Sequence, residues 1–172
     1  MNIQLLPLSP QSPYFDGAIS VYRQSTGADV DSSHQFFTKY AESKADYVGL
    51  VAVLEDDTVV GMTFGTQSAP GDWWHDRVAE AVGAAHPALQ DAWVLIELHV
   101  RQDCQNQGIG THLHDEVIAR QPYQKLLLST GKSNTGAKRL YERLGWQYLH
   151  PGLALRTSSS LSVIMNRNLD SE

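Results

Sequence analysis

The most restrictive feature of the sequence is an alternating segment, residues 92–100, that leads through a glycine-containing loop into an amphipathic helical pattern. The alternation predicts a β-strand, because successive side chains of a strand point to opposite faces. One face of this strand is apolar throughout and consists of Val94, Ile96, Leu98 and Val100. On the other face, two apolar residues are followed by Glu97 and His99. These two polar groups on an otherwise apolar strand are candidates for catalytic or binding residues.

The loop after this strand has the composition of an anion site. Residues 105–110 read Gln-Asn-Gln-Gly-Ile-Gly, and an apolar stripe that begins at Ile109 predicts a helix starting inside the loop. Gly108 and Gly110 remove side chains where a ligand would approach the backbone, and the N–H groups of a helix start bind phosphate well. The segment therefore predicts a phosphate site, although a plain strand-to-helix turn would show the same glycines.

The remaining pattern alternates short strands with helices. Its order favours an α/β or mixed α+β fold, and a chain of 172 residues is expected to form a single domain over residues 1–172. Strands are expected at residues 2–7, 47–54, 58–64, 123–128, 146–149 and 161–165, the last two on either side of a Gly/Ser-containing connection. Helices are expected after the candidate caps Ser12, Asp31, Asp72 and Asn134.

The overall composition narrows the class of partner. The chain has 13 Lys and Arg against 19 Asp and Glu, and this formal net charge of −6 disfavours nonspecific attraction to nucleic acid and to anionic membranes. A lone Cys104 excludes an intramolecular disulfide, and no stretch of about eighteen apolar residues is present. His112 and His114 are expected at the surface, because residues two apart do not share a helix face as metal ligands would. We therefore expect a cytoplasmic protein without a metal.

Two segments resemble motifs of one enzyme family. Residues 96–100, Ile-Glu-Leu-His-Val, followed by residues 105–111, Gln-Asn-Gln-Gly-Ile-Gly-Thr, resemble motif A of the GNAT acyltransferases, with its signature Q/R-x-x-G-x-G/A. Residues 134–146 resemble the following motif, N-x-x-A-x-x-L-Y-x-x-x-G-F. The loop departs from the family by having Gln102 instead of a frequent proline and Gln105-Asn106 instead of Arg-Gly. The resemblance extends over residues 47–169.

This resemblance implies a fold, a co-substrate and a set of binding residues. The implied fold is a central, mostly antiparallel mixed sheet of about seven strands, flanked by helices and splayed between the fourth and fifth strands. The implied co-substrate is acetyl-CoA, used without a metal. The residues that would bind it are Leu98, His99, Val100, Gln105, Asn106, Gln107, Gly108, Ile109, Gly110, Thr111 and Asn134.

Acetyl transfer to an amine requires a proton acceptor for the amine and a proton donor for the departing thiolate. Glu97 is the candidate base, because a carboxylate whose pKa is raised by burial can take a proton from an ammonium group. His99 and water are the alternatives. Tyr141 resembles the family tyrosine directed toward the CoA sulfur, and a phenol and a thiol are close in pKa. Both residues also have structural readings: Tyr141 as a core aromatic and Glu97 as a buried, hydrogen-bonded carboxylate.

The acceptor side is less constrained by sequence. Trp73 and His75 lie off the apolar stripe of their predicted helix, so both are expected to be exposed and are candidate walls of a substrate cleft. Tyr22 is a further candidate, because the resemblance places the early helices beside the acceptor pocket. We expect a small, cationic primary amine, and the resemblance allows a homodimer. The alternatives are a non-catalytic acyl-CoA-binding regulatory domain and a protein or peptide N-terminal acetyltransferase.

Overall fold

The structure, a computed structural model, describes residues 2–156 and 160–171. The strands are β1 (Ile3–Pro7), β2 (Val48–Leu54), β3 (Val59–Ser68), β4 (Ala92–Val100), β5 (Lys125–Gly131), β6 (Gln147–Leu153) and β7 (Ser162–Asn168). The helices are α1 (Phe15–Thr26), α2 (Val30–Ser43), α3 (Trp73–Val82), α4 (Ile109–Arg120) and α5 (Thr135–Arg143), with 3-10 turns η1 (Pro87–Leu89), η2 (Gln102–Cys104) and η3 (Leu169–Ser171).

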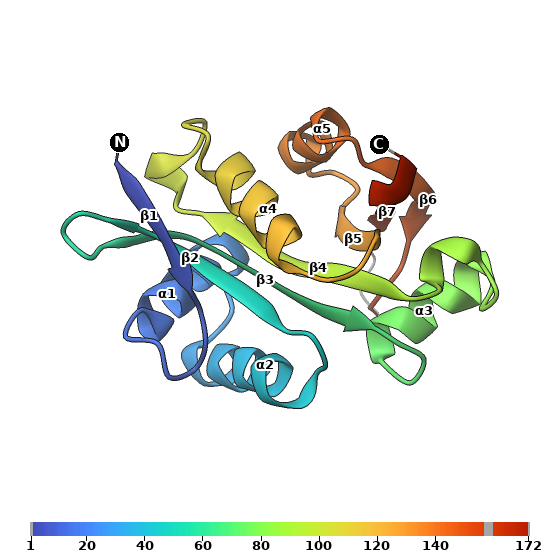
Figure 1. The fold of residues 1–172 in the computed structure, drawn as a ribbon, viewed down its shortest axis with the longest axis horizontal. Helices are drawn as coiled ribbons and strands as arrows, with labels where there is room; N and C mark the ends of the chain where they lie inside the picture. The colour runs from blue at the N-terminus through green and yellow to red at the C-terminus, as the bar shows by residue number, and fades with distance from the viewer. Residues whose placement is uncertain (1, 157–159, 172) are drawn as a thin grey trace. The chain divides into compact units, whose positions relative to one another are not determined.

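The strands form one seven-stranded sheet in the order β1-β2-β3-β4-β5-β7-β6 (Figure 1). The pairs β1–β2, β2–β3, β5–β7 and β6–β7 are antiparallel. The predicted mixed fold, with a mostly antiparallel sheet of about seven strands flanked by helices, is confirmed. Part of the connection between β6 and β7, residues 157–159, lies outside the described residues.

The chain divides into two compact units. Unit 1 contains residues 1–66 and 95–122, and unit 2 contains residues 67–94 and 123–172, so the division passes through β3 and β4. The expectation of a single domain stays a prediction. Each unit has its own buried side chains and is described by itself below.

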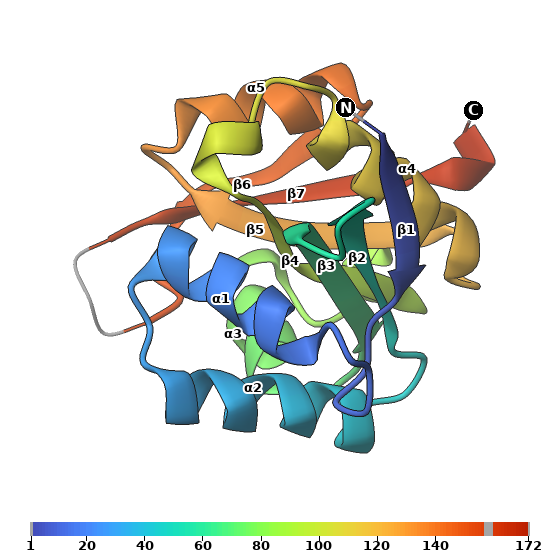
Figure 2. The ribbon, with the colours of Figure 1, turned by 90° about the vertical axis from the view of Figure 1, so that its left-hand side faces the viewer.

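The core of unit 1 lies between two helices and one face of its strands. Helices α1 and α2 run side by side across β2 and β3 (Figure 2). Alternation along the strands places every second side chain on this face, and the side chains between them point to the other face. The buried cluster consists of Leu8, Phe15, Ala18, Ile19, Val21, Phe37, Val51, Val53, Val59, Met62 and Phe64.

The start of α1 differs from the prediction. Ser12 was expected to cap the helix, but α1 begins at Phe15, and the Ser12 hydroxyl accepts a hydrogen bond from the backbone N–H of Tyr14 at 3.1 Å. Ser12 therefore stabilises a turn before the helix. The end matches the pattern, because Gly27 takes a left-handed conformation with φ 72° and its N–H donates to the carbonyl of Arg23.

Helix α2 begins at Val30, earlier than predicted. Asp29, and not Asp31, is its N-cap, because the Asp29 carboxylate accepts the N–H of Ser32 at 2.9 Å. These hydrogen bonds to Ser32 lower the pKa of Asp29. A carboxylate at this position satisfies an otherwise unpaired helix N–H, which explains the earlier start.

The opposite face of unit 1 is covered by α4, and Gly61 makes the close approach possible. A Cβ built at Gly61 would lie 2.9 Å from Leu113 Cδ1 and 3.3 Å from the carbonyl oxygen of His99. The β2–β3 register also shifts here, and the carbonyl of Val60 accepts the N–H of Arg101 at 2.8 Å. A glycine at this position thus serves both a β-bulge and the close packing of α4 against β3.

Unit 2 is built on β5, β7 and β6, with α3 and α5. Residues 126–128 of β5 are fully buried, as their unbroken Leu run predicts. Helix α3 lies in the long connection between β3 and β4, here called the insertion (residues 69–91). The indole N–H of Trp74 donates to Ser129 Oγ at 3.0 Å, and the Arg77 guanidinium donates to the Ala154 carbonyl at 2.6 Å. The insertion is therefore tied to its own unit.

Replacing Gly61 with Val should destabilise the protein by about 1–3 kcal/mol, because the added methyl groups would collide with Leu113 and the β4 backbone. Urea denaturation measures the effect. Gly136→Ala is the matched control, since a Cβ there lies 4.0 Å from its nearest neighbour on an exposed helix. The control should be neutral or more stable. Equal stability of Gly61→Val and the parent would contradict the proposed packing.

Candidate active site

The first turn of α4 leaves backbone donors without a protein acceptor. Gly108 is the N-cap, with φ 84°, and the helix has no side-chain cap. His112 is the first residue whose N–H donates within the helix, to the Gly108 carbonyl at 3.0 Å. Among the described residues, the N–H groups of Ile109, Gly110 and Thr111 therefore have no acceptor. These donors lie at the positive end of the helix dipole, an arrangement that binds anions.

The backbone before α4 turns sharply toward this helix start. Asn106 takes a left-handed conformation with φ 60°, which an asparagine tolerates better than most residues. The side-chain amide of Gln105 donates to the Val100 carbonyl at 3.0 Å and links the loop to the end of β4. A Cβ at Gly108 would meet no atom within 4 Å, so the space beside the helix start is open. The loop fits a diphosphate held by backbone amides.

The loop contributes little cationic charge. Arg101 is bound by both carboxylate oxygens of Asp103, at 2.6 and 2.9 Å, and this hydrogen bonding holds the pKa of Asp103 below its usual value. The guanidinium charge is thereby largely neutralised. An anion at the start of α4 would therefore be bound mainly by neutral backbone N–H groups.

Glu97 and His99 form a hydrogen-bonded pair on β4. Glu97 Oε2 lies 2.5 Å from His99 Nε2, and the two side chains are 20% and 18% exposed. The Thr63 hydroxyl donates to the backbone carbonyl of Glu97 at 2.8 Å and fixes the strand at this point. The predicted common face for the two side chains agrees with this contact. The pair is part-buried and still reaches solvent.

Tyr22 packs against this pair. Its ring lies edge-on to the His99 imidazole, with 5.5 Å between centroids, and stacks on Phe36 at 5.9 Å. Tyr22 also contacts Phe37 of the α1–α2 core at 5.0 Å. Tyr22 therefore has a packing role, and one side of the Glu97–His99 pair is aromatic.

Tyr141 and Asn134 both belong to α5 of unit 2. Tyr141 is 8% exposed, and its ring contacts Trp146 at 6.0 Å between centroids. Asn134 Oδ1 accepts the N–H of Ala137 at 3.2 Å and so caps α5, as the sequence predicted. Asn134 therefore stabilises the start of α5, independently of any contact with a ligand.

Trp73 and His75 have different surroundings on α3. Trp73 is 52% exposed, as its position off the apolar stripe predicted. The same expectation was wrong for His75, which is buried and whose Nδ1 lies 2.9 Å from Ser68 Oγ. A hydroxyl partner from the end of β3 allows an imidazole to be buried, and no local pattern reveals such a partner.

The predicted surface position of His114 was also wrong. His114 is fully buried, and its Nδ1 lies 2.9 Å from the carboxylate of Asp115, whereas His112 is exposed. His114 directly follows Leu113, which lies on the apolar stripe of α4. The buried face of the helix is wide enough to include His114 as well, and a prediction that allowed for this width would have placed it in the interior. In the parts of the chain that the structure describes, no three His, Cys, Asp or Glu residues are grouped to hold a metal ion.

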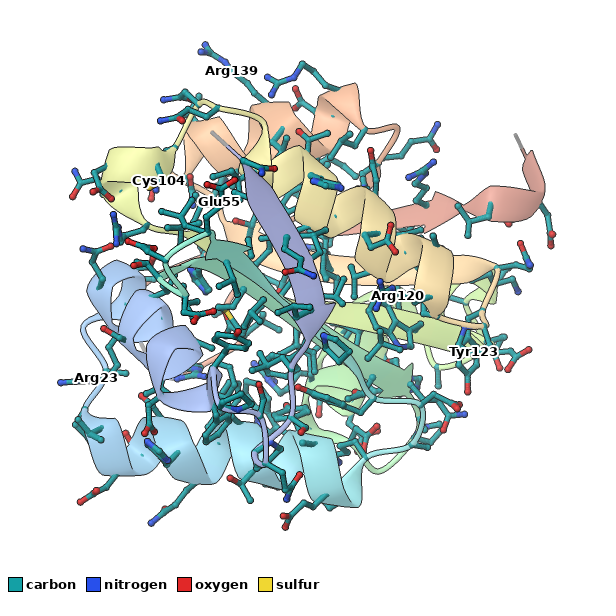
Figure 3. All side chains as sticks on the ribbon, turned by 60° about the vertical axis from the view of Figure 1, so that its left-hand side comes forward. Arg23, Glu55, Cys104, Arg120, Tyr123 and Arg139 are labelled. Atoms are coloured by element: carbon teal, nitrogen blue, oxygen red, sulfur yellow. The ribbon has the colours of Figure 1, made fainter. Side chains whose placement is uncertain are left out.

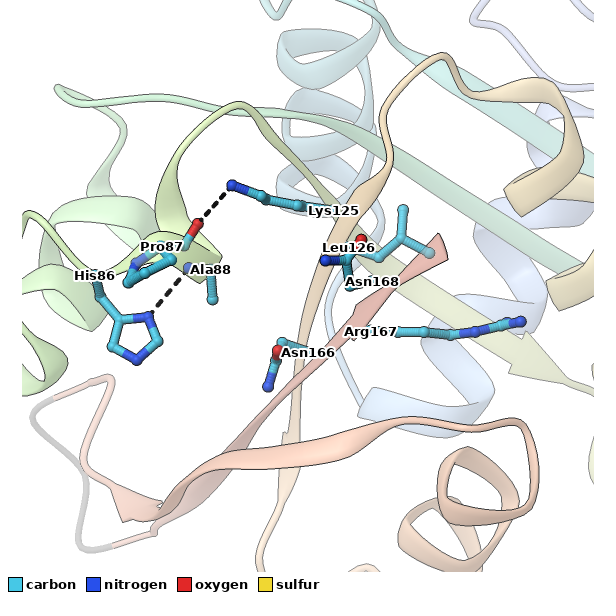
Figure 4. Close-up of a pocket in the computed structure, with 8 residues that line it drawn as sticks. All are labelled: His86, Pro87, Ala88, Lys125, Leu126, Asn166, Arg167 and Asn168. Atoms are coloured by element: carbon cyan, nitrogen blue, oxygen red, sulfur yellow. Dashed lines mark hydrogen bonds between the residues drawn. The ribbon is translucent and has the colours of Figure 1, made fainter. Parts of the chain in front are cut away.

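A cavity of about 180 Å³ lies in unit 2, and none of the predicted site residues lines it (Figure 4). Lys125 crosses it to donate to the Pro87 carbonyl at 3.0 Å, and His86 Nδ1 accepts the N–H of Ala88. The Lys125 bond attaches η1 to β5, and the His86 bond caps η1, so these polar groups of the cavity have structural roles. Its lining consists of His86, Pro87, Ala88, Lys125, Leu126, Asn166, Arg167 and Asn168.

Comparison with known proteins identifies the family of the chain. Residues 15–146 match the acetyltransferase (GNAT) family model. A GCN5-like protein acetyltransferase of Mycobacterium tuberculosis is 30% identical over 128 residues, covering 69% of this chain and 62% of the relative. The chain thus spans less than two thirds of this relative. Among residues 2–156 and 160–171, every helix is too short or too polar to cross a membrane.

Solved structures share the fold. Ard1 from Thermoplasma volcanium matches with a TM-score of 0.73 at 15% identity, covering 98% of this chain and 99% of its own. A histone acetyltransferase HPA2 and related acetyltransferase from Corynebacterium glutamicum matches with a TM-score of 0.67 at 18% identity, covering 98% and 97%. The chain belongs to the acetyltransferase (GNAT) family.

Cys104 should react slowly with thiol reagents in the folded protein. It lies in the yellow η2 turn (Figure 3), is 2% exposed, and both burial and the neighbouring Asp103 raise the pKa of its thiol. Less thiolate forms at a given pH, and the thiolate is the reactive species. At pH 8, the reaction with a chromogenic disulfide should be much faster in denaturant than in buffer. Equal rates would contradict this burial, and the single cysteine makes the assay unambiguous.

Proposed function

We propose that the chain is an acetyl-CoA-dependent N-acetyltransferase that transfers an acetyl group to a primary amine by direct attack on the thioester. One observation in unit 1 carries this proposal. A strand bearing the solvent-reaching pair Glu97 and His99 leads through η2 and a glycine-containing loop to a helix. Among the described residues, no acceptor is found for the first amides of this helix, residues 109–111. A proton acceptor and an anion cradle on one continuous segment suit an acyl donor that carries a diphosphate.

The proposed acetyl-CoA contacts follow from this segment. The N–H groups of residues 108–111 would bind the diphosphate, with the amide side chains of Gln105, Asn106 and Gln107 beside it. The backbone at residues 98–100 would lie along the pantetheine arm and polarise the thioester carbonyl, a role that needs N–H donors and no special side chain. Asn134 is proposed as a further contact with the arm on the strength of its motif.

Tyr141 is the proposed proton donor to the departing thiolate. Its position in the second family motif supports this role, and its burial supports a defined orientation. In the balanced reaction, the acceptor nitrogen forms a bond to the acetyl carbon, the C–S bond breaks, and the sulfur takes a proton. The ammonium group loses two protons overall, one of which ends on the CoA thiol and one in solvent.

A cationic acceptor is supported by the distribution of charge. Unit 1 has five Lys and Arg against twelve Asp and Glu, a formal charge of −7, whereas unit 2 has eight against seven, a charge of +1. The negative potential around the Glu97–His99 pair would attract an ammonium group. The ring of Tyr22 could contact such a cation, and the exposed Trp73 is proposed as a second acceptor contact.

A protein or peptide acceptor is the second candidate. The relationship to a GCN5-like protein acetyltransferase favours it, because that relative is named for a protein substrate. A small-amine panel that includes peptides with a free N-terminus and with internal lysine separates the two. Acetyl-CoA binding without turnover of any member would instead indicate a regulatory acyl-CoA-binding domain.

Tyr141→Phe should lower kcat by roughly 10²- to 10⁴-fold, the range for loss of a general acid, with little change in acetyl-CoA affinity. Thiol release measures the rate and calorimetry the affinity. Tyr148→Phe is the matched control, since Tyr148 is 46% exposed and donates to Glu142 on the surface. A Tyr141→Phe enzyme with parental kcat would exclude the acid role and leave Tyr141 as a core aromatic.

Acceptor charge should matter for turnover, because unit 1 is strongly acidic. At about 10 mM salt, kcat/KM should be higher for dicationic than for monocationic amines of similar nucleophilicity. The difference should shrink at about 1 M salt, where the Debye length falls from about 30 to about 3 Å. If the ratio of kcat/KM for the dicationic amine to kcat/KM for the monocationic amine is the same at both salt concentrations, this would argue against a cationic acceptor.

A further inference from the structure

We propose that His99 Nδ1, and not Glu97, accepts the proton from the acceptor amine, and that Glu97 is a positioning residue that acts through His99. This inference rests on the proposed acetyl transfer. The sequence alone favours the Glu97 carboxylate as the base, because it does not specify which atoms of the two side chains are in contact. The structure shows that Glu97 Oε2 is engaged with His99 Nε2 at 2.5 Å.

The hydrogen bond fixes which imidazole nitrogen is basic. An ionised carboxylate has no proton to donate, so the nitrogen that contacts it must be the donor. A neutral His99 therefore carries its proton on Nε2, and Nδ1 keeps its lone pair. Among the residues that the structure describes, Glu97 is the hydrogen-bond partner found for His99, and Nδ1 has no partner. With 18% of its side chain exposed, His99 can meet an incoming amine.

The surroundings hold the ring in one orientation. Tyr22 packs edge-on against the imidazole at 5.5 Å, and the Thr63 hydroxyl fixes the Glu97 backbone at 2.8 Å. A ring held by a carboxylate on one nitrogen and by an aromatic edge has little freedom to rotate. This preorganisation is what a general base needs, because its lone pair must already face the proton.

Electrostatics favour the same assignment. If Nδ1 takes the proton, an imidazolium forms 2.5 Å from the Glu97 carboxylate, and the hydrogen bond becomes charge-assisted on both sides. If Glu97 took the proton instead, the pair would lose its ionised acceptor. The transfer moves one proton from R–NH₃⁺ to Nδ1 and leaves a neutral amine with a free electron pair. The imidazolium then releases this proton to solvent, so the pair is unchanged after each turnover.

The tautomer can be measured without any turnover. Long-range ¹H–¹⁵N correlation spectra of the ¹⁵N-labelled chain distinguish protonated from bare imidazole nitrogens, and comparison with His99→Gln assigns the signal. Above the pH at which the imidazolium signal disappears, we expect the Nε2–H form. A predominant Nδ1–H form would overturn the proposal, because the lone pair would then face Glu97.

The kinetic test compares His99→Gln, Glu97→Gln and wild type, with His86→Gln in unit 2 as the control for loss of a histidine. His99→Gln should lose roughly 10²- to 10⁴-fold in kcat/KM for a strongly basic amine while its acetyl-CoA affinity stays within about threefold. Glu97→Gln should lose less, as a positioning residue does. His99→Gln within threefold of wild type, beside a much larger loss in Glu97→Gln, would make Glu97 the base.

A weakly basic amine separates a base from a structural residue. Such an acceptor is already mostly neutral at the assay pH, so the loss in His99→Gln should shrink to within about threefold. An equal loss for strongly and weakly basic amines would mean that His99 only maintains the fold of the site, and would overturn the proposal. A wild-type chain that neither binds acetyl-CoA nor acetylates any amine would overturn the proposed function itself, and the tautomer measurement would still test the pair.

Discussion

The first turn of α4 exposes backbone N–H groups for which the described part of the chain provides no acceptor, and several neighbouring features maintain this arrangement. Gly108 provides the left-handed entry to the helix, and Gln105 ties the loop to the end of β4. Gly61 lets α4 approach β3 closely enough to stay in place. A side-chain cap on α4 would stabilise the helix but would occupy the donors that bind an anion.

The chemistry of the proposed site depends on a second local constraint, the pair formed by Glu97 and His99. Their spacing of two on β4 places both side chains on one face, and the same strand continues into the anion cradle. Unit 1 thus carries the proposed proton acceptor and the proposed diphosphate site on one segment, from β4 through η2 to α4. The strong negative charge of unit 1 would favour a cationic acceptor. The neutral N–H groups of α4 would bind the anionic co-substrate without the help of a Lys or Arg side chain.

Sequence reasoning predicted the elements with strong periodicity and missed features that depend on distant contacts. The alternation of residues 92–100 and the Asn134 cap were read correctly, because both signals are local. The burial of His75 depends on a hydroxyl from β3, and the early start of α2 on which of two aspartates takes the cap. The direct contact of Glu97 with His99 also depends on rotamers, which spacing does not specify.

Most of the proposed site depends on one contact, between the open amides of α4 and the diphosphate of the co-substrate. Backbone ¹H–¹⁵N spectra recorded with CoA and with pantetheine, which lacks the diphosphate, detect this contact. We predict that CoA shifts the amide signals of residues 108–111 and that pantetheine leaves them nearly unchanged while shifting those of residues 98–100. Saturating CoA that leaves the signals of residues 108–111 in place would contradict the account.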